Sequence, residues 1–286
     1  MKKPLFPSMD KSGLYNYMTY FYHTTRHSLL AYRRFDEFQR IVRGRKLTSY
    51  FQPIFHLQNN DCLGFEVLNR PPISSHFPTT ESFYDFIGYT DQVFAFERFC
   101  RELSLERFKK AAVDSSAKDA VIFLNVHPEV LSDSNYRSGE TLQLLSRFGF
   151  SPEQIVFELT ERQAVQDYDA FERILSHYRS QGFRIAIDDA GSGYNSLKAI
   201  VSLKPEFIKL DKSLIRDVYR QPNQRKVVKL LQEFAEASGT HIIAEGIEST
   251  DEISYLRSEG IEYGQGYALG RPETKLQSVP LSLASM

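Results

Sequence analysis

The chain has 286 residues, of which 42% are hydrophobic and 25% are charged, and its formal net charge is -1. This is an ordinary globular composition with enough apolar residues for a large core. The near-neutral charge gives no electrostatic case for duplex nucleic acid or an anionic membrane as a partner. The chain has two cysteines, no apolar leader and no long uninterrupted apolar stretch. These features argue against a disulfide-rich secreted domain and against a transmembrane segment, and they predict a cytoplasmic location.

Residues 1–45 differ in composition from the rest and are predicted to form an N-terminal helical extension. Residues 13–32 are rich in aromatic side chains, and residues 33–45 are basic with Phe35, Phe38 and Ile41 at helical spacing. The second part is therefore predicted to be an amphipathic helix that packs on the following domain. The aromatic part is compatible with a helix covering one end of that domain, a dimer contact, a membrane-surface anchor or a docking site for a partner.

From about residue 46, short apolar runs alternate with segments of helical periodicity. The runs have the length and the β-branched content of buried parallel strands. Helices are predicted at 82–110 (one or two), 140–148, 167–181, 196–202, 225–238 and 250–259. This alternation indicates a parallel α/β architecture, and the length is close to the roughly 250 residues typical of one barrel. We therefore expect a single (β/α)8 TIM-like barrel domain over residues 46–286.

Eight of the apolar runs contain or precede a polar residue that is able to bind a metal ion or a phosphate. These residues are Gln52, Glu66, Asn125, Glu158, the pair Asp188–Asp189, Lys209, Glu245 and Gln265. A parallel barrel brings the C-terminal ends of its strands to one mouth, where catalytic groups collect. The pattern therefore predicts one acidic cup built from residues that are far apart in the sequence.

The carboxylates of this set are predicted to bind metal ions. Converging carboxylates raise one another's pKa unless cations neutralise them, and hard divalent ions such as Mg²⁺ or Mn²⁺ prefer oxygen ligands. Two adjacent aspartates at a strand end suggest a two-metal site, with ions roughly 3.5–4 Å apart. Each acidic residue alone is more often a salt-bridge or capping residue, so the prediction depends on the combination. The members are Glu66, Asn125, Glu158, Asp188, Asp189 and Glu245.

Lys209 and Arg70 are the candidate cationic groups of the cup. In the run 207–211, Lys209 alternates with apolar neighbours, which is consistent either with a residue facing the cup or with a surface lysine paired with Asp211. Burial is expected to lower the pKa of Lys209 and to let it orient or deprotonate a water molecule. Arg70 follows Glu66 by four residues and is suited to a phosphate. The glycine-rich segment 189–194 is either a phosphate-binding turn or a movable loop.

Taken together, these segments resemble the EAL family of cyclic-di-GMP phosphodiesterases. The resemblance covers about residues 46–275. It rests on Phe51-Gln52-Pro53-Ile54, Glu66-Val67-Leu68-Asn69-Arg70, Leu124-Asn125-Val126, Phe157-Glu158-Leu159-Thr160-Glu161, the segment 188–197, Ile208-Lys209-Leu210-Asp211, Ala244-Glu245-Gly246-Ile247-Glu248 and Gly264-Gln265-Gly266-Tyr267.

The resemblance implies a barrel whose first strand runs antiparallel, and an enzyme that hydrolyses cyclic-di-GMP to the linear dinucleotide pGpG with two Mg²⁺ or Mn²⁺ ions. It also implies a homodimer. It assigns Glu66, Asn125, Glu158, Asp188, Asp189 and Glu245 to the metals. Lys209, Glu245 and Glu161 would be catalytic, with Lys209 contacting the nucleophilic water and Glu161 steadying the glycine-rich loop. Gln52, Leu68, Arg70 and Gln265 would contact the substrate, Gln265 beside the water and the metals.

Three positions depart from the common pattern of the family. Val67 replaces an alanine, Ala190 replaces a phenylalanine and Asn195 replaces a serine. The changes leave the set of metal ligands intact, and those at Ala190 and Asn195 lie in the loop linked to activation through the dimer. The alternatives to an active enzyme are a non-catalytic cyclic-di-GMP receptor and a signalling scaffold. Without the resemblance, an acidic two-metal barrel is equally compatible with other phosphoester substrates.

Overall fold

The computed structural model describes residues 29–113, 117–127, 139–160, 168–191, 200–201 and 203–280. The chain divides into two compact units, Met1–Leu47 with Pro71–Phe83, and Thr48–Arg70 with Tyr84–Met286. The domain boundary at about residue 45 remains a prediction. Among the described helices, none combines the length and the apolar content that a membrane crossing requires.

The described part of the first unit is built on a helix at 29–43. Phe38 and Ile41 are buried on this helix, whereas Phe35 is 37% exposed. Arg33, Arg40 and Arg43 are exposed, and the partly buried Arg34 lies over the ring of Phe77. The N-terminal helical extension as a whole remains a prediction. The ring of Phe38 packs on Phe83 with centroids 5.9 Å apart, and Phe83 packs edge-on against Phe77 at 5.0 Å. The contact predicted between this helix and the barrel remains a prediction.

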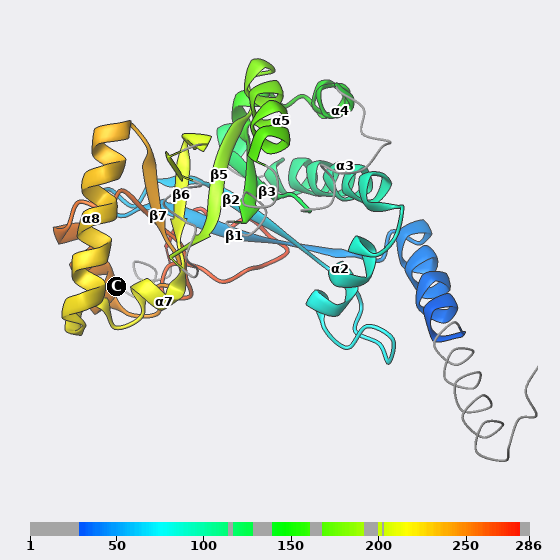
Figure 1. Ribbon diagram of the computed structural model, residues 1–286, viewed down its shortest axis with the longest axis horizontal. Helices are drawn as coiled ribbons and strands as arrows, with labels where there is room; N and C mark the ends of the chain where they lie inside the picture. The colour runs from blue at the N-terminus through cyan, green and yellow to red at the C-terminus, as the bar shows by residue number, and fades with distance from the viewer. Residues whose placement is uncertain are drawn as a thin grey trace, which may run out of the picture. The chain divides into compact units, whose positions relative to one another are not determined.

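The second unit contains a closed barrel whose strands follow one another in chain order (Figure 1). β1 pairs antiparallel with both β2 and β8, and all other neighbours are parallel. The predicted TIM-like barrel with a reversed first strand is therefore confirmed. The strands are β1 Thr48–His56, β2 Cys62–Arg70, β3 Val121–Asn125, β4 Ile155–Thr160, β5 Arg184–Ala190, β6 Phe207–Leu210, β7 His241–Ala244 and β8 Tyr263–Gly264.

The helices confirm most of the sequence-based boundaries. They are α2 Thr80–Gly88, α3 Val93–Ala112, α4 Glu140–Phe148, α5 Tyr168–Ser180, α7 Lys212–Ile215, α8 Pro222–Ser238 and α9 Thr250–Ser258, with short 3₁₀ turns η1 Ala117–Asp119, η3 Pro152–Gln154 and η5 Val218–Arg220. The segment predicted at 82–110 is two helices. α7 was not predicted because a single turn carries no periodicity. Most of the helix predicted at 196–202 lies outside the described residues.

An apolar layer fills the interior of the barrel below the strand ends. Its buried residues are Ile54, Val121, Phe123, Val156, Ala186, Phe207 and Ile243. Because alternate residues of a strand share a face, the residue two positions further along each parallel strand also points into the barrel. These next residues are Asn125, Glu158, Asp188, Lys209 and Glu245, and on the antiparallel β1 the equivalent residue is Gln52. A polar layer therefore lies directly above an apolar floor.

The outward faces of the strands pack against the surrounding helices. Ile208 of β6 and Ile242 of β7 share a buried cluster with Val228 and Leu231 of α8, which lies beside β7 in Figure 1. This packing fixes which face of each strand points outward, because a slip of one residue would bring apolar side chains into the polar layer. The alternation seen at Lys209 in the sequence is thereby explained.

Candidate active site

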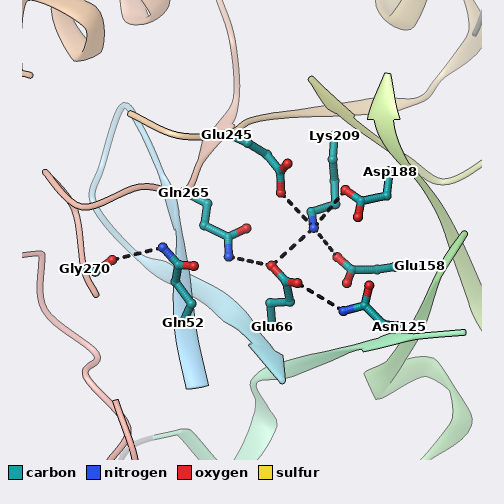
Figure 2. Close-up of polar contacts among 9 residues, drawn as sticks. All are labelled: Gln52, Glu66, Asn125, Glu158, Asp188, Lys209, Glu245, Gln265 and Gly270. Carbon is teal, nitrogen blue, oxygen red and sulfur yellow. Dashed lines mark hydrogen bonds and ion pairs between the residues drawn. The ribbon is translucent and has the colours of Figure 1, made fainter. Parts of the chain in front are cut away.

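Lys209 lies at the centre of the polar layer, and carboxylates from four other strands and strand ends surround it (Figure 2). Its side chain is only 1% exposed. The distances from Lys209 Nζ are 2.6 Å to Glu158 Oε1, 2.8 Å to Glu245 Oε1, 3.1 Å to Asp188 Oδ1 and 3.3 Å to Glu66 Oε2. The predicted alternative of a surface lysine paired with Asp211 is therefore wrong. Asp211 instead caps α7 by accepting a hydrogen bond from the Ser213 amide.

A bulge in β5 brings the two adjacent aspartates to the same site. Ile187 pairs with Ile208 and Ala190 pairs with Leu210, so two residues of β5 lie opposite the single residue Lys209 of β6. Asp189 occupies the left-handed region with φ of 56°. The backbone turn lets Asp188 and Asp189 approach one centre although consecutive residues of a regular strand point to opposite faces.

Glu66 lies in the middle of β2 rather than at its end, and its carboxylate is held from both sides. Asn125 Nδ2 donates to Glu66 Oε1 at 3.1 Å, and Gln265 Nε2 donates to Glu66 Oε2 at 2.8 Å. β2 extends past the site to Arg70, whereas β3 ends at Asn125. The two amide side chains therefore fix the orientation of Glu66 between β3 and β8.

The carboxylates of the cluster differ strongly in proton affinity. Burial raises the pKa of Glu158 well above its ordinary value, and the negative charge of Glu66 raises it further. Burial also raises the pKa of Glu245 to about 8, against the opposing effect of Lys209 and with the help of Asp188. For Glu66, burial acts upward, but Lys209 and the two amide donors overcome it and the pKa is lowered.

The prediction that burial leaves Lys209 with a lowered pKa is wrong for the protein without metal ions. Burial acts to lower it, as predicted, but Asp188, Glu158, Glu245 and Glu66 together raise the pKa well above its ordinary value. Among these protein groups, Lys209 is therefore a firmly protonated ammonium. It is suited to donating hydrogen bonds and to neutralising negative charge, and it is not suited to accepting a proton from water.

The donor set fits divalent metal ions. Asp188, Asp189 and Glu245 each offer an oxygen atom, and these three atoms lie within 4.8 Å of one another. Two buried oxygens, Glu158 Oε2 and Gln265 Oε1, accept no hydrogen bond from the described part of the chain. Buried polar atoms without partners are costly, and oxygen atoms are the ligands that hard divalent cations prefer.

Three of the four predicted substrate-contacting residues share the inner face of the first two strands, and the fourth, Gln265, follows β8. Gln52 pairs directly with Glu66 in the β1–β2 ladder, and its Nε2 donates to the Gly270 carbonyl at 3.3 Å (Figure 2). Leu68 and Arg70 follow Glu66 at two and four residues and so share its face. The guanidinium of Arg70 lies over the ring of Tyr50, with 5.2 Å from its central carbon to the ring centroid. Glu161 lies outside the described residues.

Three buried charged residues outside the cluster were not predicted. Glu97 and Arg101 of α3 form an ion pair at 3.4 Å, and the Glu97 carboxylate accepts the backbone N–H of His127, two residues beyond Asn125. Glu252 of α9 accepts hydrogen bonds from loops next to the site. The signals were present, because Ser249 and Glu252 have capping-box spacing and Glu97 and Arg101 have i,i+4 spacing in an aromatic-rich helix.

Comparison with known proteins places this barrel in a family. The model of the EAL domain matches residues 36–272, and the chain belongs to this family. The chain is 30% identical over 244 residues to a protein of Pseudomonas aeruginosa named cyclic di-GMP phosphodiesterase RocR, a match that covers 81% of this chain and 59% of that protein. The chain spans about a third of the length of the first curated relatives that it matches.

Solved structures agree with this assignment. A standalone EAL protein of Vibrio cholerae in its c-di-GMP-bound form superposes with a TM-score of 0.71 at 28% identity, covering 83% of this chain and 97% of that chain. A complex of Klebsiella pneumoniae BlrP1 with manganese and cy-diGMP superposes with a TM-score of 0.71 at 25% identity, covering 79% of this chain and 56% of that chain.

Proposed function

We propose that this chain hydrolyses one phosphodiester bond of cyclic-di-GMP and releases the linear dinucleotide pGpG, with the help of two Mg²⁺ or Mn²⁺ ions. The observation that carries the proposal is that four carboxylates of an EAL domain converge on the buried ammonium of Lys209. They belong to Glu66, Glu158, Asp188 and Glu245. Relatives named as cyclic di-GMP phosphodiesterases and solved EAL structures with this nucleotide and manganese support it.

The metal ions would be held by Glu66, Asn125, Glu158, Asp188, Asp189 and Glu245. When bound, two divalent cations lower the pKa of a water molecule and neutralise the negative charge that develops on the phosphate. The residues supply oxygen ligands from five strands or strand ends. Because the barrel fixes these ligands before substrate binds, little reorganisation is needed during the reaction.

Lys209 acts in this proposal as a fixed hydrogen-bond donor. Its ammonium orients the attacking water and stabilises negative charge near the phosphate, while Gln265 holds Glu66 in place. Gln52, Leu68 and Arg70 line one inner face of β1 and β2, from which they contact the nucleotide, and Arg70 is suited to a phosphate oxygen. Glu161 would steady the predicted glycine-rich loop at 189–194. A homodimer and a contact through residues 13–32 remain predictions.

A product assay tests the proposed function directly. The whole chain is incubated with cyclic-di-GMP in Mg²⁺, in Mn²⁺ and in chelator, and the nucleotides are separated by chromatography. We expect pGpG in either metal and none in chelator. Nucleotide binding without product under both metals would instead indicate a receptor, and failure to bind cyclic-di-GMP would indicate a scaffold.

The stability of the metal-free protein should fall as the pH rises. A carboxyl group whose pKa is raised by folding contributes stability below its unfolded pKa, and this contribution is lost as the pH rises through the folded pKa. For Glu245 that window runs from its ordinary value of 4.5 to about 8. In chelator we expect the melting temperature to decrease across this window, by about 2–4 °C for each kcal/mol lost.

Metal binding should reverse this trend, because the ligand carboxylates must lose their protons to bind a cation. The increase in melting temperature on adding Mg²⁺ is therefore expected to be larger at the alkaline end of the window than at the acidic end. Glu245→Gln serves as the control, because an amide does not ionise and the variant should show a flatter pH profile. A metal-induced shift that decreases with pH would contradict the assignment of Glu245.

A further inference from the structure

Glu252 is a buried carboxylate outside the acidic cluster. It lies in the first turn of α9, is 3% exposed and accepts hydrogen bonds from three backbone amides. Its Oε1 accepts from Asp217 N at 2.9 Å, and its Oε2 accepts from Glu248 N at 2.8 Å and Ser249 N at 3.0 Å. These bonds compensate for burying the charge, and their donors come from two separate loops.

Helix capping explains only part of this arrangement. Ser249 Oγ accepts from the Glu252 amide and Glu252 Oε2 accepts from the Ser249 amide, which is a capping box at the start of α9. The bond from Asp217 has no role in capping, because Asp217 lies between α7 and η5. Asp217 also adopts the left-handed conformation with φ of 54°, which is uncommon outside glycine although aspartate adopts it more readily than most residues. Glu252 therefore joins the start of α9 to the turn after α7.

The joined loops lead directly to residues of the site. Lys209 precedes α7 by three residues, and Glu245 precedes Glu248 by three. The Glu245 amide donates to the Leu210 carbonyl at 3.1 Å. Gly246 has φ of 66°, and a Cβ added to it would lie 2.5 Å from Lys212 Cβ. The backbone after β7 is thus in close contact with the first residue of α7.

The same loop also supports the end of β8. Ile247 N donates to the Gln265 carbonyl at 3.1 Å, and Ala268 N donates to the Ile247 carbonyl at 3.0 Å. A Cβ at Gly266 would overlap the backbone of Ile247. The segment 245–249 therefore lies between the end of β6, which carries Lys209, and the loop after β8, which carries Gln265, and Figure 2 shows Glu245, Lys209 and Gln265 converging.

We propose that Glu252 is a positioning residue that holds Glu245 at the correct distance from Lys209 and thereby sets the metal affinity of the site. This inference rests on the proposed function for its catalytic consequence. The distance to be maintained is the 2.8 Å between Glu245 Oε1 and Lys209 Nζ. Groups bonded directly to metal ligands change metal affinity or activity by about 10–100-fold when they are mutated, and Glu252 acts one step further out through the backbone of 245–249, so the lower end of this range, about 10-fold, is expected.

The variant Glu252→Gln separates capping from the link to α7. A glutamine has one acceptor oxygen, so it can keep the cap at Ser249 but presents N–H donors toward the amide of Asp217. We expect turnover of cyclic-di-GMP to decrease by about 10-fold with an unchanged KM for the nucleotide. We also expect the affinity for Mn²⁺ alone, titrated into chelator-treated protein, to decrease. Amide hydrogen exchange should accelerate in both 209–217 and 245–249 and stay unchanged in β3.

Two matched variants give the controls. Asp251→Asn makes the same change of charge at an exposed neighbouring position of α9 and should behave like the wild type. Ser249→Ala removes the serine cap alone and should lower the melting temperature without changing Mn²⁺ affinity. Wild-type Mn²⁺ affinity in Glu252→Gln, or equal losses in Ser249→Ala, would overturn the proposal. If the wild type itself makes no pGpG, the proposed function fails, whereas the Mn²⁺ titration and the exchange measurement still decide the role of Glu252.

Discussion

Replacing Lys209 by methionine is expected to reduce the proposed hydrolysis of cyclic-di-GMP by about 10²–10³-fold, the range typical of a lost hydrogen-bond donor that stabilises developing negative charge. Methionine fills a similar volume but cannot donate to water or balance negative charge. In the structure Lys209 is the cation that contacts Glu158, Glu245, Asp188 and Glu66. Product formation is measured by chromatography at saturating Mn²⁺ so that metal occupancy does not limit the rate.

The affinity for Mn²⁺ should not decrease in Lys209→Met, although its turnover does. The ammonium of Lys209 competes with divalent cations for the same carboxylates, so Lys209→Met should bind Mn²⁺ at least as tightly as the wild type. Lys226→Met, which removes an exposed lysine of α8, is the matched control and should leave both quantities unchanged. Hydrolysis at the wild-type rate in Lys209→Met with saturating Mn²⁺ would refute the role assigned to this lysine.

Glu66→Gln is compared with Lys209→Met because it removes a proposed metal ligand, whereas Lys209→Met removes the hydrogen-bond donor. Asn125 Nδ2 and Gln265 Nε2 both donate to the carboxylate of Glu66, and a glutamine would place its own N–H group against one of them. We expect weaker Mn²⁺ binding together with slower turnover. Opposite effects on metal affinity in the two variants would separate a ligand from a water-orienting group.

The inward direction of most site residues was predictable because they lie on a strand, or directly after one, whose periodicity fixes the side-chain direction. β6 alternates between the inward-facing Phe207 and Lys209 and outward-facing apolar residues, so one inward residue predicts the next. The same rule places Glu158 above Val156 and Glu245 above Ile243. A barrel then brings these strand ends together whatever their separation in sequence. The resemblance to the EAL family added the order of the motifs and the reversed first strand.

Other properties depended on distances between strands that no sequence pattern reports. The pKa of Lys209 rises because carboxylates from separate elements all reach its ammonium, whereas burial alone acts in the opposite direction. The bulge at Asp188 and Asp189 depends on the register between β5 and β6. The bond between Asp217 and Glu252 joins residues 35 positions apart. The capping-box spacing in the sequence indicates only the contact of Glu252 with Ser249 and not its contact with Asp217. The roles predicted for Glu161 and for the glycine-rich segment 189–194 remain predictions.

Replacing Arg101 by methionine is expected to destabilise the fold by about 3–5 kcal/mol, because it leaves a buried charge without its partner. Arg101 and Glu97 have side chains that are 6% and 5% exposed and form an ion pair at 3.4 Å. Arg101 also donates to Thr141 Oγ1 at 3.0 Å, and its guanidinium lies over the ring of Phe157. Burial raises the pKa of Glu97, while Arg101 and the His127 amide oppose that rise.

Thermal and denaturant unfolding measure this effect, at a pH high enough to keep Glu97 ionised. At about 2–4 °C per kcal/mol, the melting temperature should fall by roughly 6–20 °C. Lys110→Met is a matched control in the same helix, because Lys110 forms an i,i+4 pair with Glu106 at 2.6 Å but has a side chain that is 73% exposed. Exposed pairs of this kind contribute about 0.3–0.5 kcal/mol. Glu97→Gln combined with Arg101→Met should recover part of the loss, because it removes the unpaired charge. Equal destabilisation by Arg101→Met and Lys110→Met would show that the α3 ion pair does not support the β3 end of the barrel.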